Sequence, residues 1–144
     1  MRWVVAQFAL MAVIAVGIFT GPRLHALAFH VTGASLVAIG VIVVAWARLE
    51  LGRSFTVLPR PREGGELVTR GPFRVVRHPV YLGAMLLFVG LSLLYSWPSL
   101  ILSGALALLW AAKARVEERY LAERFPEYEE YRRRVRRRLV PFLY

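Results

Sequence analysis

Apolar residues in this chain come in four long blocks whose lengths are comparable with a membrane span. The blocks cover residues 3–19, 24–47, 79–95 and 98–112. A helix needs roughly 20 residues to cross a bilayer, so the second block is comfortable and the first and third are borderline. The fourth is short unless its helix continues past Lys113 with long side chains that reach the interface. The pattern predicts an all-α integral membrane protein with four transmembrane helices.

The chain has a simple organisation. Because no internal repeat or low-complexity linker divides it, we expect one domain over residues 1–144. The first apolar block is longer than the core of a signal peptide, and no small-residue cleavage site precedes a polar sequence. We therefore expect this block to remain as a helix.

Two polar segments carry most of the residues outside the apolar blocks. The loop 48–78 contains a Pro-Arg-Pro-Arg-Glu-Gly-Gly stretch, which is too rich in turn residues for a long helix or strand. The tail 113–144 favours helix up to a break at Pro126, after which a second helix is expected. An apolar stripe would run along that second helix beside the arginine run from Arg132 to Arg138. The stripe consists of Tyr128, Tyr131, Val135 and Leu139. We expect this amphipathic helix to lie on the membrane surface.

Charge placement predicts the orientation of the chain. Of the 19 Lys and Arg residues, seven lie in the loop 48–78 and ten from Lys113 onward, whereas the connection between the first two spans holds only Arg23. By the positive-inside rule, both termini and the middle loop are cytoplasmic. The arginine run is expected to bind anionic lipid headgroups, at roughly 1 kcal/mol per residue near the surface, and not nucleic acid.

Composition excludes several kinds of chemistry. The chain has no cysteine, which rules out disulfides, thiolate metal sites and a cysteine nucleophile. Its three histidines, His25, His30 and His78, have no metal-binding spacing. We therefore expect no metal site.

The segment that joins the middle loop to the third apolar block carries the most informative residues. Pro79 suits the first position of a helix, with His78 as its cap and Tyr81 on nearly the same face. The free N–H groups at a helix start favour an anion, and Arg77 adds a permanent positive charge. A simple helix cap is the alternative for an isolated His-Pro pair, but the neighbouring ionisable residues favour a binding site.

A set of short motifs follows the same order as in a known family. The motifs are Leu67-Val68-Thr69-x-Gly71-Pro72-Phe73, Arg77-His78-Pro79-x-Tyr81-x-Gly83, Glu117-Glu118-x-x-Leu121-x-x-x-Phe125 and Tyr128-x-x-Tyr131-x-x-x-Val135 with a late Pro141. Over about residues 51–141 the chain resembles the isoprenylcysteine carboxyl methyltransferase family, including its bacterial members. The resemblance implies an integral membrane methyltransferase that uses S-adenosylmethionine, in a prokaryotic inner or plasma membrane.

The resemblance also implies which residues hold the cofactor and the acceptor. The cofactor-binding positions fall on Gly65, Glu66, Leu67, Val68, Phe73, Arg77, His78, Pro79, Val80, Tyr81 and Glu117. The basic residue that contacts the acceptor in relatives corresponds to Lys113, with Arg115 as a second candidate. The chain departs from the family pattern in having a lysine here, since lysine cannot grip a carboxylate with two parallel bonds as arginine does. It also has Phe125-Pro126 where relatives commonly read Phe-Gly, which affects the local alignment.

The chemistry implied is direct displacement at the sulfonium methyl group, with a carboxylate of a lipophilic or lipidated molecule as the leading acceptor. Such a carboxylate is already ionised at neutral pH, so alignment and desolvation suffice. Phospholipid amines and small thiols stay open as acceptors. Two other classes also remain: a membrane reductase of the sterol-reductase type using NADPH, and a non-enzymatic protein that binds lipid or a partner. Glu118 is expected to form only ordinary surface ion pairs with neighbouring basic residues.

Overall fold

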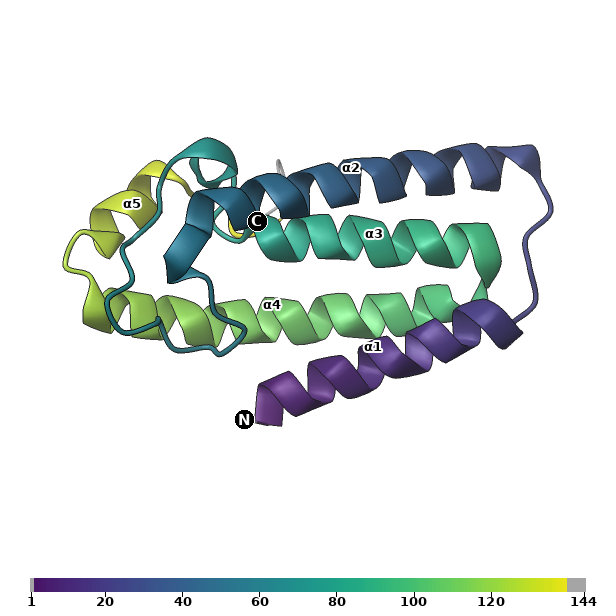
Figure 1. Cartoon of the computed structure of the whole chain (residues 1–144), viewed down its shortest axis with the longest axis horizontal. Helices are drawn as coiled ribbons and strands as arrows, with labels where there is room; N and C mark the ends of the chain where they lie inside the picture. The colour runs from purple at the N-terminus through teal and green to yellow at the C-terminus, as the bar shows by residue number, and fades with distance from the viewer. Residues whose placement is uncertain (1, 140–144) are drawn as a thin grey trace.

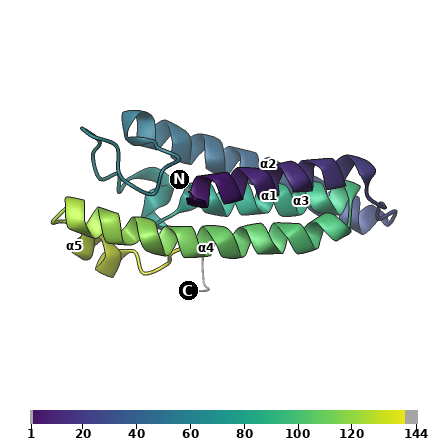
Figure 2. The same ribbon diagram turned by 90° about the horizontal axis from the view of Figure 1, so that it is seen from below.

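The computed structural model describes residues 2–139, and in this part of the chain every regular element is helical. The elements are α1 (Arg2–Thr20), α2 (Leu27–Leu51), the 3-10 turns η1 (Gly52–Ser54) and η2 (Gly71–Arg74), α3 (Pro79–Tyr95), α4 (Pro98–Arg124) and α5 (Tyr128–Arg134). The four long helices run alongside one another, and α5 and the loop between η1 and η2 gather at one end of the bundle (Figure 1). We call this end the polar end. Figure 2 shows the same arrangement from below, with α1 in front of α3 and α4 alongside.

The helices confirm the predicted class of an all-α integral membrane protein. Among the described residues, α1, α2 and α4 are long and apolar enough to cross a membrane, and α3 is an apolar helix of 17 residues. The fourth apolar block is part of a helix that continues past Lys113, as a membrane span requires, because α4 runs without interruption from Pro98 to Arg124. The last turns of α4 extend beyond the apolar part of the bundle and contribute side chains to the polar end.

Two pairs of glycines bring α2 and α3 into close contact. A Cβ atom added at Gly40 would lie 2.6 Å from the carbonyl oxygen of Gly83, and one added at Gly33 would lie 2.8 Å from that of Gly90. The seven-residue spacing within each helix places both glycines on one face, so the backbones touch along the seam. This close packing fixes the position of α3 against α2, and thus where its first turn lies relative to the middle loop.

A second contact surface joins α1 to α4. Ile14 and Ile18 of α1 pack against Leu106 and Trp110 of α4, and all four side chains are buried. The α1 helix is therefore a wall of the bundle at the same depth as the polar end of α4.

The predicted second helix after Pro126 is present as α5, but its apolar stripe packs on the protein, so the prediction that this stripe lies on the membrane surface is wrong. Helix α5 ends at Arg134, and the expected stripe is buried, with exposed fractions of 1% for Tyr128, 3% for Tyr131, 6% for Val135 and 7% for Leu139. Three of these side chains form a core with Ala47 and Phe73, and the Tyr131 hydroxyl donates to the Phe73 carbonyl oxygen at 2.8 Å. Pro141, the last residue of the motif set, lies outside the described residues.

Candidate active site

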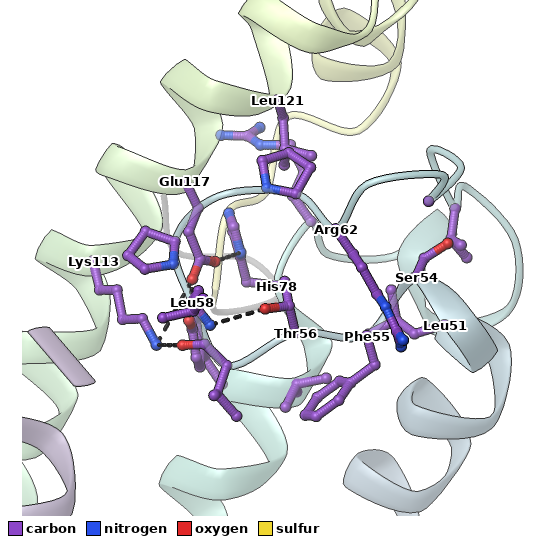
Figure 3. A pocket seen from close by; sticks show the side chains of 18 of the residues that line it. Leu51, Ser54, Phe55, Thr56, Leu58, Arg62, His78, Lys113, Glu117 and Leu121 are labelled. Carbon is purple, nitrogen blue, oxygen red and sulfur yellow. Dashed lines mark hydrogen bonds and ion pairs between the residues drawn. The ribbon is translucent and has the colours of Figure 1, made fainter. Parts of the chain in front are cut away.

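A cavity of about 270 Å³ lies at the polar end, enclosed by α1, α3, α4, α5 and the middle loop. Figure 3 shows Lys113 and Glu117 from α4 and His78 from the start of α3 facing one another across it. The residues predicted for the site that line the cavity are Gly65, Glu66, Leu67, Val68, Phe73, Arg77, His78, Pro79, Val80, Tyr81, Lys113 and Glu117. The structure thus brings together residues that are up to 52 positions apart in sequence, Gly65 and Glu117 being the extremes. Arg115 lies outside the cavity, with its side chain exposed.

The middle loop is held over the cavity by a few backbone hydrogen bonds. The Gly65 amide donates to the Arg62 carbonyl at 3.0 Å, and the Glu66 amide donates to the Ser54 hydroxyl at 2.9 Å. These bonds fold the turn-rich stretch back on η1. As a result, the four residues 65–68 border the cavity although they belong to no helix.

His78 stands at the junction of the loop and α3. It occupies the N-cap position with Pro79 as the first helical residue, as predicted, but its side chain makes no cap hydrogen bond. Its Nε2 atom lies 3.2 Å from Glu118 Oε1, and its ring stacks on Tyr81 with centroids 5.7 Å apart. The His78 amide donates to the Arg138 carbonyl at 3.0 Å. Both the ring and the backbone of this residue are therefore fixed by the surrounding chain.

Glu117 is the less exposed of two acidic residues that line the cavity, the other being Glu66. Its Oε1 atom accepts a hydrogen bond from the Tyr81 hydroxyl, and its Oε2 atom lies 3.6 Å from His78 Nδ1. The same carboxylate lies 3.8 Å from Lys113 Nζ. A carboxylate that is partly exposed to the cavity and surrounded by donors can pair with a cationic or hydroxylated ligand.

Lys113 lines the cavity together with three arginines, Arg60, Arg62 and Arg77, and it is almost completely buried, with 1% of its surface exposed. Its ammonium donates to Gln7 Oε1 at 2.9 Å and to the Val57 carbonyl oxygen at 2.8 Å. The Trp110 indole N–H lies 3.4 Å from the same Gln7 oxygen. Sequence reasoning missed Gln7, although it is the one amide side chain inside the first apolar block and such residues commonly have functional partners.

Glu118 forms a buried ionic cluster, so the prediction that it makes only surface ion pairs is wrong. Its carboxylate accepts from Arg77 Nε at 2.9 Å and from Arg138 Nε at 3.1 Å, in addition to the His78 contact. The Arg77 guanidinium also donates to the carbonyl oxygens of Val135 and Arg136 at 2.7 and 2.8 Å. Arg77 borders the cavity, but its charge is used to hold the segment after α5 against the start of α3.

Tyr128 supplies a polar atom that sequence reasoning did not assign to the site. Among the described residues, its hydroxyl is the buried side-chain polar atom without a hydrogen-bond partner, and the residue borders the cavity. Burial raises the pKa of this hydroxyl, and the nearby Glu118 carboxylate raises it further, so the group stays protonated and available as a donor. Buried polar atoms are rarely left unpaired, so this hydroxyl is a candidate for contact with a ligand.

The described residues include no group of three or more His, Cys, Asp and Glu side chains that could hold a metal ion. The cavity is instead lined, among the described residues, by two carboxylates, by the Lys113 ammonium, by the His78 imidazole and by three guanidinium groups, set among apolar walls; the carboxylates are Glu66 and Glu117, and the guanidinium groups are Arg60, Arg62 and Arg77. This arrangement suits an organic ligand that carries both charged and apolar parts.

Comparison with known proteins agrees with this geometry. The family described as phospholipid methyltransferase matches residues 28–128, a range that leaves out α1. The chain is 36% identical over 103 residues to cobalt-zinc-cadmium resistance protein CzcN of Cupriavidus metallidurans, which is 69% of this chain and 47% of that protein.

Plant proteins are also similar to the chain. It is 34% identical over 108 residues to protein-S-isoprenylcysteine O-methyltransferase B of Arabidopsis thaliana, covering 72% of this chain and 55% of that protein. It is 33% identical over 116 residues to a probable protein-S-isoprenylcysteine O-methyltransferase of Oryza sativa subsp. japonica, covering 77% and 60%. The chain spans about half the length of these curated relatives. The family match and the plant relatives confirm the resemblance drawn from the motifs, and the chain belongs to the phospholipid methyltransferase family of membrane proteins, together with isoprenylcysteine O-methyltransferases.

Proposed function

We propose that this chain transfers the methyl group of S-adenosylmethionine to a lipophilic acceptor, a carboxylate of the isoprenylcysteine type. The observation that carries the proposal is one cavity lined by Glu117, by the buried Lys113 and by Tyr128, a residue whose buried hydroxyl is unpaired. The family membership and the names of the plant relatives support the same activity. In this proposal the chain is a single domain in a prokaryotic plasma membrane, with the polar end and both termini on the cytoplasmic side.

The residues of the cavity fit the methyl donor. S-adenosylmethionine combines a carboxylate, an ammonium, a sulfonium that makes its methyl group electrophilic, and an adenine. Glu117 would pair with the ammonium or the ribose, and the first-turn amides of Val80 and Tyr81, which have no acceptor inside α3, would hold the carboxylate. The Tyr128 hydroxyl would find its missing partner on the same ligand. Phe73 borders the cavity as an apolar surface for the adenine.

Lys113 would position the acceptor. Two of the three donors of its ammonium are engaged by Gln7 and Val57, which fixes the group in place and leaves capacity for one further contact. A buried positive charge attracts a carboxylate and disfavours a phospholipid amine, which is itself cationic at neutral pH. Because a carboxylate acceptor needs no base, His78 would have a structural role at the edge of the cavity, held in place by its contact with Glu118.

The donor site is tested by calorimetry on the detergent-purified full chain, with S-adenosylmethionine and, separately, NADPH. We expect saturable binding of the methyl donor that Glu117→Gln weakens at least tenfold, because a charged pair inside a cavity is lost. Glu123→Gln, an exposed glutamate on the same helix, is the matched control and is expected to bind like the wild type. Binding of NADPH in place of the methyl donor would favour the reductase alternative and refute the proposal.

The acceptor is tested with radiolabelled methyl donor and two S-prenylated cysteine compounds, one with a free carboxylate and one with the carboxylate converted to an amide. We expect label to transfer to the first compound only, and to be released as methanol by mild base, since a methyl ester is cleaved there and an N-methyl or S-methyl group is not. Base-stable label in a phospholipid fraction would identify an amine acceptor instead and contradict the assignment of Lys113.

The proposal also keeps the sequence prediction that the arginine run from Arg132 to Arg138 faces anionic lipid headgroups and not nucleic acid. Arg132, Arg133, Arg134, Arg136 and Arg137 are exposed although the apolar residues between them are buried. The run would therefore face the headgroups from the edge of the polar end, without entering the membrane as a helix.

A further inference from the structure

A second hollow at the polar end shares no residue with the active cavity. It has a volume of about 330 Å³ and is lined by Arg115, Glu118, Arg119, Ala122, Arg132 and Arg138. It is formed where α4, α5 and the segment after α5 meet. Arg115, which the sequence suggested for acceptor binding, belongs to this hollow.

The hollow has an excess of positive charge. Among the described residues that line it, the carboxylate is that of Glu118, which is already engaged by Arg77, His78 and Arg138. Arg132 pairs with Glu129 at 3.0 Å, and both of these side chains are about half exposed. The remaining lining charges, Arg115 and Arg119, stand one turn apart on α4, where like charges repel. Arg115, Arg119 and Arg132 therefore add positive charge beyond what Glu118 balances, and this charge favours binding of an anion.

The position of the hollow identifies the source of that anion. Ile101, Leu108 and Arg115 are spaced by seven residues and so lie on one face of α4. Ile101 and Leu108 are 70% and 74% exposed, which is the face that an apolar helix turns toward lipid. The arginines begin where this face leaves the apolar block 98–112, at the level at which lipid phosphates lie.

We propose that the hollow lined by Arg115, Arg119, Arg132 and Arg138 binds the phosphate headgroup of an anionic phospholipid, whose acyl chains run along the Ile101 and Leu108 face of α4. Planar guanidinium groups suit a phosphodiester, which they can bind through paired N–H donors. The site goes beyond the proposed methyl transfer and does not depend on it. It differs from a general basic surface because two of its charges, Arg115 and Arg119, come from α4 and not from the arginine run of the tail.

The test measures the affinity of the full chain, purified in a neutral detergent, for phosphatidylglycerol and phosphatidylcholine by native mass spectrometry. The double variant Arg115→Gln/Arg119→Gln removes two lining charges that make no contact with the active cavity. Its matched control is Arg74→Gln/Arg124→Gln, which removes two exposed charges that lie outside the hollow, outside the arginine run and outside the active cavity. Thermal unfolding of each variant establishes that it is folded.

We expect the wild type to prefer phosphatidylglycerol, and the lining variant to bind it about thirtyfold more weakly, the equivalent of two charges at about 1 kcal/mol each. The control variant should retain the wild-type affinity within about threefold. An equal loss in both variants would mean that the basic surface acts only through its total charge, and would overturn the site. Competition by millimolar inorganic phosphate as effective as the lipid would overturn the assignment to a membrane lipid in favour of a soluble anion.

Discussion

The buried carboxylate of Glu118 gives the sharpest test of how the polar end is held together. Its side chain and that of Arg77 are each 6% exposed, and their atoms meet at 2.9 Å. Glu118→Gln keeps the shape of the side chain but removes the charge and turns one acceptor atom into a donor. The change leaves Arg77 buried without its counter-ion, while the guanidinium keeps its bonds to two carbonyl oxygens of the tail.

The magnitude follows from this geometry. Removing one partner of a buried pair costs about 3–5 kcal/mol, and the carbonyl bonds that Arg77 retains place this case near the lower end, at about 3 kcal/mol. For a chain of this size, each kcal/mol lowers the melting temperature by about 2–4 °C, so we expect a decrease of about 6–12 °C. The assay is thermal unfolding of the detergent-purified chain, followed by the fluorescence of its four tryptophans.

The control for this prediction is Glu129→Gln, which breaks the exposed pair with Arg132. Exposed pairs contribute about 0–1 kcal/mol, so this variant should melt within about 3 °C of the wild type. Replacing both members of the buried pair, as Arg77→Met/Glu118→Leu, should recover part of the stability lost in Glu118→Gln, because no uncompensated charge remains. If Glu118→Gln melts as the Glu129→Gln control does, the cluster contributes no net stability and the reasoning fails.

Three further substitutions test the packing and the cavity. Gly40→Ala should destabilise the chain by about 1–3 kcal/mol in thermal unfolding, since the added Cβ would meet backbone atoms at 2.6 and 2.7 Å. Gly104→Ala is the control and should leave the stability unchanged, because its Cβ would have no neighbouring atom within 4 Å. Tyr128→Phe removes the unpaired hydroxyl, so calorimetry should show methyl-donor binding about tenfold weaker while unfolding shows no loss of stability. Gln7→Leu takes one of two hydrogen-bond acceptors from the buried ammonium of Lys113, and should lower kcat/KM for the acceptor about tenfold without changing the affinity for the methyl donor. Gln7→Glu, which restores an acceptor oxygen, should recover the rate. An equal fall in methyl-donor affinity would show general damage to the site and contradict a positioning role for Gln7.

Much of the architecture was predictable because it depends on local pattern. The four apolar blocks correspond to α1–α4, and the His78-Pro79 pair marks the start of α3, since proline fixes the backbone angle that a helix start needs. The break near Pro126 was also predictable from the same residue preference. The site positions came from the motif resemblance, and the cavity contains all of them except Arg115.

What the sequence could not reveal depends on contacts between distant segments. Gln7 lies 106 positions before Lys113, and neither residue has a local feature that points to the other. The tail is a similar case: alternation of apolar and basic residues suits a membrane surface and a protein surface equally well. Only the presence of Ala47 and Phe73 nearby decides that Tyr128 and Tyr131 are buried in the protein.

The two neighbouring glutamates have separate roles: Glu117 lines the cavity, whereas Glu118 belongs to the ionic cluster that holds the polar end together. Successive residues on a helix point about 100° apart, so Glu117 faces the cavity while Glu118 faces the segment after α5. Glu118 neutralises Arg77 and contacts the His78 ring, whereas Glu117 contacts the Tyr81 hydroxyl, the His78 ring and the Lys113 ammonium. A ligand can then compete for Glu117 without dismantling the polar end. The same separation predicts opposite effects of two chemically identical changes: Glu117→Gln should weaken ligand binding with little loss of stability, and Glu118→Gln should do the reverse.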